Sequence, residues 1–177
     1  MSITNINDIE VIIRNELITQ SQLSENYVRN ALSLYGTDLN QEVGTDIFDT
    51  ITTNQNLILF ELLNNHTSND VTETVDDKIK IYKSYSVYII IYGDNSNTLA
   101  NTLIARLRTE EVQENLQMQG VYIERIEDVE SINEFKNDVI WERTDFNIQI
   151  ACEMNVNKIT DSNSFEELSQ LTIIGGK

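Results

Sequence analysis

Residues 78–92, KIKIYKSYSVYIIIY, are the stretch of this chain that decides its fold. The second half is built almost entirely from β-branched and aromatic residues, which favour an extended strand. The apolar side chains alternate between two faces, with Tyr85, Val87, Ile89 and Ile91 on one face and Tyr88, Ile90 and Tyr92 on the other. A strand that is apolar on both faces is typical of the interior of a sheet that is covered on each side.

The residues that follow predict a turn and then a helix. Gly93-Asp94-Asn95 has strong turn chemistry, and Ser96 or Asn97 can cap a helix that begins there. The spacing of three or four residues predicts one buried stripe along a single long helix that ends at Gly120, formed by Leu99, Leu103, Leu107 and Leu116.

Two further strands are expected downstream, over residues 121–130 and 139–156, joined by a turn or short helix over 131–138. The second is the better patterned, because polar residues alternate with apolar ones in the manner of a half-buried antiparallel strand. Its polar side would carry Asp145, Asn147 and Gln149, and its apolar side Phe146, Ile148, Ile150, Cys152, Met154 and Val156.

Upstream, residues 56–63 (NLILFELL) suit either a buried strand or a buried helical turn, and their length and flanking Asn residues favour the strand. Residues 64–77 form a polar, acidic stretch that predicts an exposed loop or hairpin arm. Residues 36–55 show only a weak pattern.

The N-terminal part, residues 8–35, is predicted to be helical. Asn7 or Asp8 can cap a first helix over 8–20, whose apolar stripe would be Ile6, Ile9, Ile13 and Leu17. Residues 24–35 predict a second helix that Ser24 caps and that the left-handed Gly36 ends, although Tyr27, Val28 and Tyr35 would also suit a strand. Within 163–177, the capping box Ser164-x-x-Glu167 predicts a short C-terminal helix before a frayed tail.

These segments predict one α+β domain over residues 1–177, in which residues 56–156 hold the sheet and the central helix. The sheet would be mostly antiparallel and flanked by an N-terminal helix and one long helix. No internal repeat and no Gly- or Ser-rich linker divides the chain. Because proline is absent, the turns must rely on Gly, Asn, Asp and Ser.

Composition excludes several classes of function. The 177 residues include 12 Lys and Arg against 29 Asp and Glu, which gives a net charge of −17. A basic nucleic-acid-binding face is therefore not expected. No apolar run is long enough to span a bilayer, so no membrane partner is expected. The first residues, MSITNINDIE, lack the features of a secretion signal.

The sequence predicts no enzyme, metal or cofactor site. His66 is the only histidine and lies in a polar stretch, whereas Cys152 is the only cysteine and lies on the apolar side of a strand. The many carboxylates do not single out a catalytic pair, and DNSNT (94–98) lacks the alternating acids of a calcium loop. Arg143 and Asp145 share one face of their strand, so they can form an ion pair or reach a neighbouring chain.

From residue 56 onward, the order of small features resembles the neck or tail terminator proteins of long-tailed bacteriophages. The match covers about residues 56–156, and the expected N-terminal helix also fits. The features that carry the resemblance are Tyr92-Gly93-Asp94, Leu99-Ala100, Gly120, Arg143 and Asp145-Phe146.

The resemblance implies a structural virion protein of the neck and tail, assembled in the host cytoplasm. It implies a homohexameric ring that closes the tail tube and contacts the tube protein, the neck or connector proteins and possibly the tail sheath. DNA would pass through without specific binding, past a lumen or interface lined by Asp70, Glu73, Asp76 and Asp77. Alternatives are another head–tail connector, an acidic intracellular module that masks a basic partner and, with least support, a hydrolase built on two carboxylates.

Overall fold

The computed structural model describes residues 3–31, 47–64, 71–75 and 78–157. Within these ranges, seven strands form one sheet whose main path runs β1-β2-β4-β7-β5, while β3 pairs with β4 and β6 pairs with β7. The strands are β1 (Val28–Asn30), β2 (Leu57–Asn64), β3 (Val71–Val75), β4 (Lys78–Tyr92), β5 (Val121–Ile126), β6 (Glu130–Lys136) and β7 (Val139–Asn157).

The antiparallel pair β4–β7 forms the centre of the sheet. Its register runs without interruption from Lys78 opposite Asn157 to Tyr92 opposite Arg143. The outer edge of β4 is shared by β2 and β3, and the outer edge of β7 is shared by β5 and β6. Among the described strands, only β1 and β2 pair in parallel, and Ile3 adds an isolated parallel bridge to Met154. The predicted strands over 56–63, 78–92 and 139–156 and the mostly antiparallel sheet are therefore confirmed.

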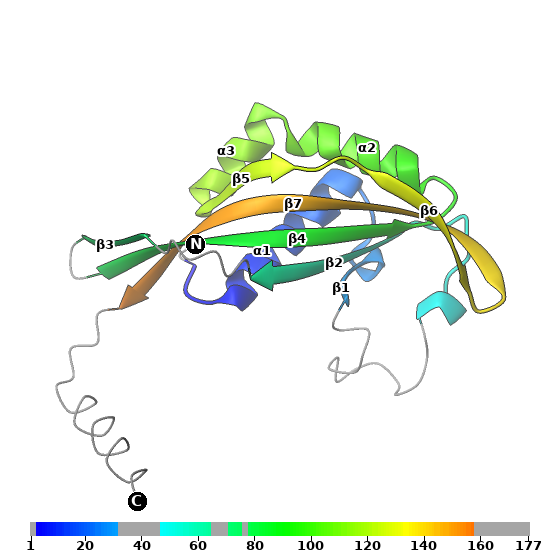
Figure 1. Ribbon diagram of the computed structural model, residues 1–177, viewed down its shortest axis with the longest axis horizontal. Helices are drawn as coiled ribbons and strands as arrows, with labels where there is room; N and C mark the ends of the chain where they lie inside the picture. The colour runs from blue at the N-terminus through cyan, green and yellow to red at the C-terminus, as the bar shows by residue number, and fades with distance from the viewer. Residues whose placement is uncertain (1–2, 32–46, 65–70, 76–77, 158–177) are drawn as a thin grey trace, which may run out of the picture.

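Three helices cover one face of the sheet, as Figure 1 shows: α1 (Ile6–Ser21), α2 (Ser96–Leu107) and α3 (Glu110–Met118). Their apolar stripes join the inward-facing residues of β2, β4, β5 and β7 in one core. The predicted inward sets on β4 and β7 are buried in this core: Tyr85, Val87, Ile89, Ile91, Phe146, Ile148, Ile150, Cys152 and Met154. The α+β class is thus confirmed, and the core lies between the sheet and the helices.

A second, smaller cluster covers one end of the opposite face. The short 3-10 turn η3 (Ile47–Asp49) places its apolar side chains against β2, β4 and β7. Phe48 packs edge-on against Tyr92 and Trp141, with ring centroids 4.8 and 5.3 Å apart. This contact explains why β4 carries an aromatic residue, Tyr92, on the face away from the helices. The weak pattern over 36–55 concealed a segment that contributes to the core.

The single long helix predicted after residue 96 is wrong, because the structure has two helices separated at Thr109. Thr109 adopts an extended backbone, and its hydroxyl donates to the carbonyl of Arg106 at 2.7 Å. The following Glu110 and Glu111 lie in the first turn of α3, where negative charge suits the positive helix end. Leu116 is buried as predicted, but from α3.

The turn or short helix predicted over 131–138 is also wrong. Most of this segment is β6, and only Asn137 and Asp138 make the turn to β7. Both residues have positive φ, 49° and 61°, which is the backbone that a tight two-residue hairpin requires. Asn and Asp tolerate this conformation better than most residues, so the chain makes a hairpin here without glycine.

The prediction of a second N-terminal helix is wrong for the part of residues 24–35 that the structure describes. Glu25–Tyr27 form a 3-10 turn and Val28–Asn30 form β1, the strand alternative that the aromatic and β-branched residues also suited. Pairing with β2 gives β1 hydrogen bonds between strands, whereas a short isolated helix is only marginally stable in water. Residues 32–35, like the C-terminal segment 163–177, lie outside the described residues.

The first helix is confirmed, but it begins earlier than predicted. The cap is Asn5, whose side chain accepts from the backbone N–H groups of Asn7 and Asp8. Asp8 completes a capping box by accepting from the backbone of Asn5 at 3.2 Å. The buried stripe is Ile9, Ile12, Ile13 and Leu17, while Ile6 is exposed.

Candidate assembly surface

The β6–β7 hairpin projects at one end of the molecule's long axis, opposite the end where β7 finishes (Figure 1). We call residues 132–140 the hairpin tip. Phe135 and Ile140 face each other across the two strands and are 69% and 65% exposed. Ile132 and Val139 are also exposed. The tip therefore presents apolar side chains to solvent at the edge of the second core cluster.

The outer edge of β6 is unpaired in the described part of the chain. One edge of β6 bonds β7, and no other described strand lies against it. The backbone N–H and C=O groups of an open edge can pair with another chain, and natural proteins often place charges there to prevent this. Two charged side chains of β6, Glu134 and Lys136, interact with groups of their own chain.

A network of polar side chains holds the base of the hairpin to the sheet. Arg143 donates two hydrogen bonds to Asp145, at 2.8 and 2.6 Å, and a third to Glu134 at 2.9 Å. Tyr92 donates to Glu134 at 2.6 Å, and Tyr88 donates to Asp145 at 2.5 Å. The ion pair predicted from the spacing of Arg143 and Asp145 is thus confirmed within one chain, and it links β4, β6 and β7.

Ionisation within this network is shifted in directions that strengthen it. The hydrogen bond from Arg143 to Asp145 raises the pKa of the guanidinium, although burial opposes the rise. Burial opposes ionisation of Glu134, but hydrogen bonds from Tyr92 and Arg143 outweigh it and lower the pKa of this carboxyl. Burial and the hydrogen bond to Glu134 raise the pKa of Tyr92. The network is therefore charged but internally compensated at neutral pH.

The turn of the hairpin contacts the second core cluster. The ammonium group of Lys136 lies 4.3 Å from the centre of the Phe48 ring and 5.2 Å from that of Tyr92. Asn137 donates to Asp49 at 2.8 Å. Because these contacts involve the last residue of β6 and the first residue of the turn, the turn is held to η3 while the side chains of Phe135 and Ile140 stay exposed.

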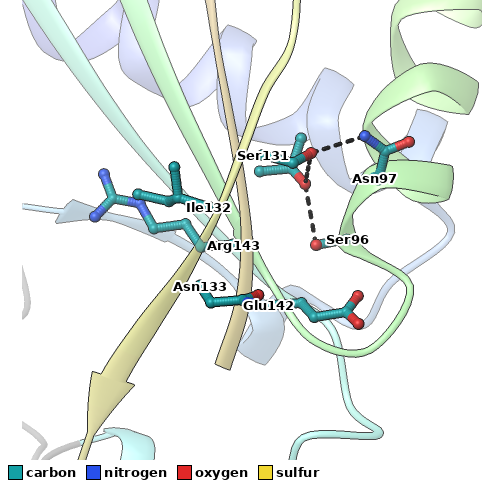
Figure 2. A pocket seen from close by; sticks show the side chains of 8 residues that line it. Ser96, Asn97, Ser131, Ile132, Asn133, Glu142 and Arg143 are labelled. Carbon is teal, nitrogen blue, oxygen red and sulfur yellow. Dashed lines mark hydrogen bonds between the residues drawn. The ribbon is translucent and has the colours of Figure 1, made fainter. Parts of the chain in front are cut away.

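On its helix side, the hairpin borders a hollow of about 150 Å³ at the start of α2 (Figure 2). The hydroxyl of Thr144 lies 3.0 Å from that of Ser96 and 3.1 Å from that of Ser131, and Asn97 donates to Ser131 at 2.8 Å. Figure 2 shows this chain of hydrogen bonds on one side and Arg143 pointing away from it. The hydroxyls bond one another rather than a general base, so the arrangement fits a structural clamp between α2 and the hairpin.

The other predicted residues have the following positions. Cys152 is buried on the helix side of β7, and burial raises the pKa of its thiol to about 12, as expected for a structural cysteine. Glu73 lies on β3, whereas His66, Asp70, Asp76 and Asp77 lie outside the described residues. The segment 94–98 forms a turn and the start of α2. The described residues contain no group of three side chains suited to hold a metal ion.

Sequence reasoning missed the hairpin tip and the hydroxyl chain. The one signal for the hairpin is the turn pair Asn137-Asp138, because the apolar residues before it, Ile132 and Phe135, do not alternate as in a half-buried strand. The hydroxyl chain has no such signal, because Ser96, Ser131 and Thr144 are far apart in the sequence. Among the described helices, none is long and apolar enough to cross a membrane.

These features define a structural α+β domain whose described polar clusters join its own elements and which exposes four large apolar side chains on a projecting hairpin. A family model described as phage neck terminator protein matches residues 47–176. The chain belongs to this family, which makes it a structural protein of the bacteriophage neck. The match begins at the η3 turn and includes the whole hairpin. A search of curated proteins found no match.

Proposed function

We propose that copies of this chain form a closed ring that terminates the tail tube and joins it to the neck connector. The observation that carries this proposal is the combination of an open edge strand and an exposed apolar hairpin tip in a member of the phage neck terminator family. Closing a ring of identical subunits covers such surfaces in every copy. Six subunits are the number that the resemblance implies.

The charge of the chain suits a passage for DNA. At a net charge of −17, the protein repels phosphate groups at short range rather than binding them. DNA would therefore cross the ring without specific contacts. Asp70, Glu73, Asp76 and Asp77 are our candidates for the lumen or an interface, since they concentrate negative charge in one segment.

The proposed partners are other copies of this chain, the tail tube protein, the connector proteins of the neck and, in a contractile tail, the sheath. Assembly would take place in the host cytoplasm, and the finished ring would be part of the virion neck. The ring would act mechanically and catalyse no reaction.

The test is to image the purified protein alone and after mixing with purified tail tubes, and to measure its mass by sedimentation. We expect ring-shaped particles, or a cap at one end of each tube, and no retention of duplex DNA at moderate salt. A protein that stays monomeric and leaves the tubes bare would contradict the proposal. Recovery of one stoichiometric basic partner from host extract would instead favour the masking module.

A further inference from the structure

We propose that the hairpin tip of one copy is covered by the C-terminal segment, residues 158–177, of a neighbouring copy. This inference rests on the proposed ring and specifies a contact between its neighbouring subunits. The tip offers Phe135 and Ile140, which lie side by side and are more than half exposed. The segment supplies the matching chemistry, because it carries six large apolar side chains in twenty residues: Ile159, Phe165, Leu168, Leu171, Ile173 and Ile174.

The length of the chain favours a neighbour over the same copy. β7 runs from the tip to Asn157, and Ile140 lies 157 − 140 = 17 residues before that end. At about 3.3 Å per residue, the two ends are about 56 Å apart along the strand. Phe165 follows Asn157 by eight residues and Leu168 by eleven, which allows at most about 29 and 40 Å when fully extended. Neither side chain reaches Ile140 of its own copy along the strand, and Leu171 falls short at about 50 Å; among the apolar residues of the segment, only Ile173 and Ile174, at about 58 and 61 Å, can span that distance when fully extended.

The positions of the two surfaces suit a ring. The tip and the start of the C-terminal segment lie at opposite ends of β7, as the ribbon in Figure 1 shows. A contact between different surfaces of successive copies is heterologous, and such contacts generate a closed ring when the rotation between copies closes. The family model matches residues 47–176, which include the hairpin tip and all of the C-terminal segment except its last residue.

The contact can be trapped by a disulfide between two chains that each carry one new cysteine. We would prepare Ile140→Cys and Leu168→Cys separately, mix them, allow assembly in the presence of tail tubes and oxidise. Because Cys152 is buried, it does not compete. We expect a linked dimer only in the mixture. The chain that carries both substitutions should give a ladder of linked copies rather than an internally linked monomer.

A second experiment asks whether the two surfaces act together. Phe135→Asp and a chain ending at Asn157 should each weaken association about tenfold or more, which corresponds to removal of one well-packed apolar contact. The two changes combined should weaken it no further than either alone, since each removes the same contact. Met118→Asp, at an exposed methionine on α3 away from the tip, is the matched control and should have little effect. Circular dichroism would verify that each variant is folded.

Each outcome decides between the inference and the proposed function. Rings that form without any link, with only an internal link, or with fully additive losses would overturn the inference and leave the ring intact. If the unmodified chain fails to associate even in the presence of tubes, both the inference and the proposed function are overturned.

Discussion

At the scale of single residues, Arg143 shows how the hairpin is held. Its guanidinium binds Asp145 through two hydrogen bonds and Glu134 through a third, so that one side chain connects neighbouring strands. Bidentate pairing of this kind is geometrically specific, because the planar fork of arginine matches a carboxylate. The spacing in the sequence predicted the first pair, but Glu134 was identified only by the pairing of β6 with β7.

Replacement of Glu134 by Gln should make the unfolding free energy of the protein less dependent on pH in the acidic range. The pKa of Glu134 is lowered in the folded state, so its ionised form stabilises the fold above its ordinary value of 4.5, and this contribution is lost as the pH falls through the lowered value. Glu134→Gln should cost about 1 kcal/mol of unfolding free energy at pH 7 and less at pH 3.

Urea denaturation at several pH values measures this difference. The matched control is Glu142→Gln on the other face of β7, whose carboxylate forms no ion pair with a described residue. A loss at pH 3 as large as the loss at pH 7 would contradict the assignment of the charged network to Glu134.

Cys152 should be protected from thiol reagents in the folded protein. Its side chain is buried and its pKa is raised to about 12, so the reactive thiolate is scarce near pH 8 and access to it is blocked. We expect labelling by a disulfide reagent to be at least about a hundredfold slower in the native protein than in urea, because reaction must await opening of the core. Equal rates in the two conditions would show that β7 is not packed as described.

At the scale of elements, the turn from β4 to α2 sets the position of the helix layer. Gly93 has a φ of +125° and its N–H donates to the carbonyl of Glu142 at 3.0 Å. The N–H of Asp94 donates to the carbonyl of Thr53 at 2.8 Å. The turn therefore joins β4, β7 and the segment before β2. The sequence predicted a turn here, and the structure explains why a glycine occupies it.

Gly93→Ala should destabilise the protein by about 2 kcal/mol or more, since an L side chain is strained at this φ. A Cβ at this position would also lie 2.8 Å from the carbonyl oxygen of Gln55 and clash with the side chain of Asn56. Thermal unfolding of Gly93→Ala can be compared with that of Asp94→Ala, which alters an exposed residue of the same turn. Similar melting temperatures for the two variants would argue against the strained turn.

At the scale of the whole molecule, the excess of acidic residues opposes both folding and association. Carboxylates outnumber cations by 29 to 12, so most of them have no cation of their own to pair with. Ion pairs that join described residues of the sheet include Lys80–Glu153, Lys136–Glu134, Arg143–Glu134 and Arg143–Asp145. Self-repulsion among the carboxylates is long-ranged at low salt and weakens as the Debye length shortens.

Raising the salt concentration should therefore stabilise the monomer and promote its assembly. Between about 20 and 200 mM sodium chloride, we expect the melting temperature to rise by a few degrees and the association of copies to strengthen, because screening reduces repulsion between like charges. Sedimentation at each salt concentration measures the second effect. Association that weakens with salt would show that the contact between copies depends on attraction between opposite charges.

The elements predicted correctly are those whose own residues carry a strong period. α1, β2, β4 and β7 have apolar residues at helical or alternating spacing, and the turn at Gly93 has residues that suit few other structures. The errors fall where local preference is weak. Thr109 interrupts a pattern that would otherwise continue as one helix, and β1 depends on its pairing with β2. β6 has only two apolar residues, Ile132 and Phe135, and they lie on opposite faces of the strand.

The amino-acid sequence by itself determined that this chain is a mostly antiparallel α+β domain, strongly acidic, with a central two-sided strand and the order of features of a neck terminator protein. These properties follow from periodicity, composition and sequence order, which are local. Only the tertiary structure decided that η3 joins the core, that the network around Arg143 links three strands, and that Phe135 and Ile140 are exposed at the tip of a hairpin. All three features depend on strand pairing or on contacts between residues far apart in the chain, so none of them is encoded in a single segment.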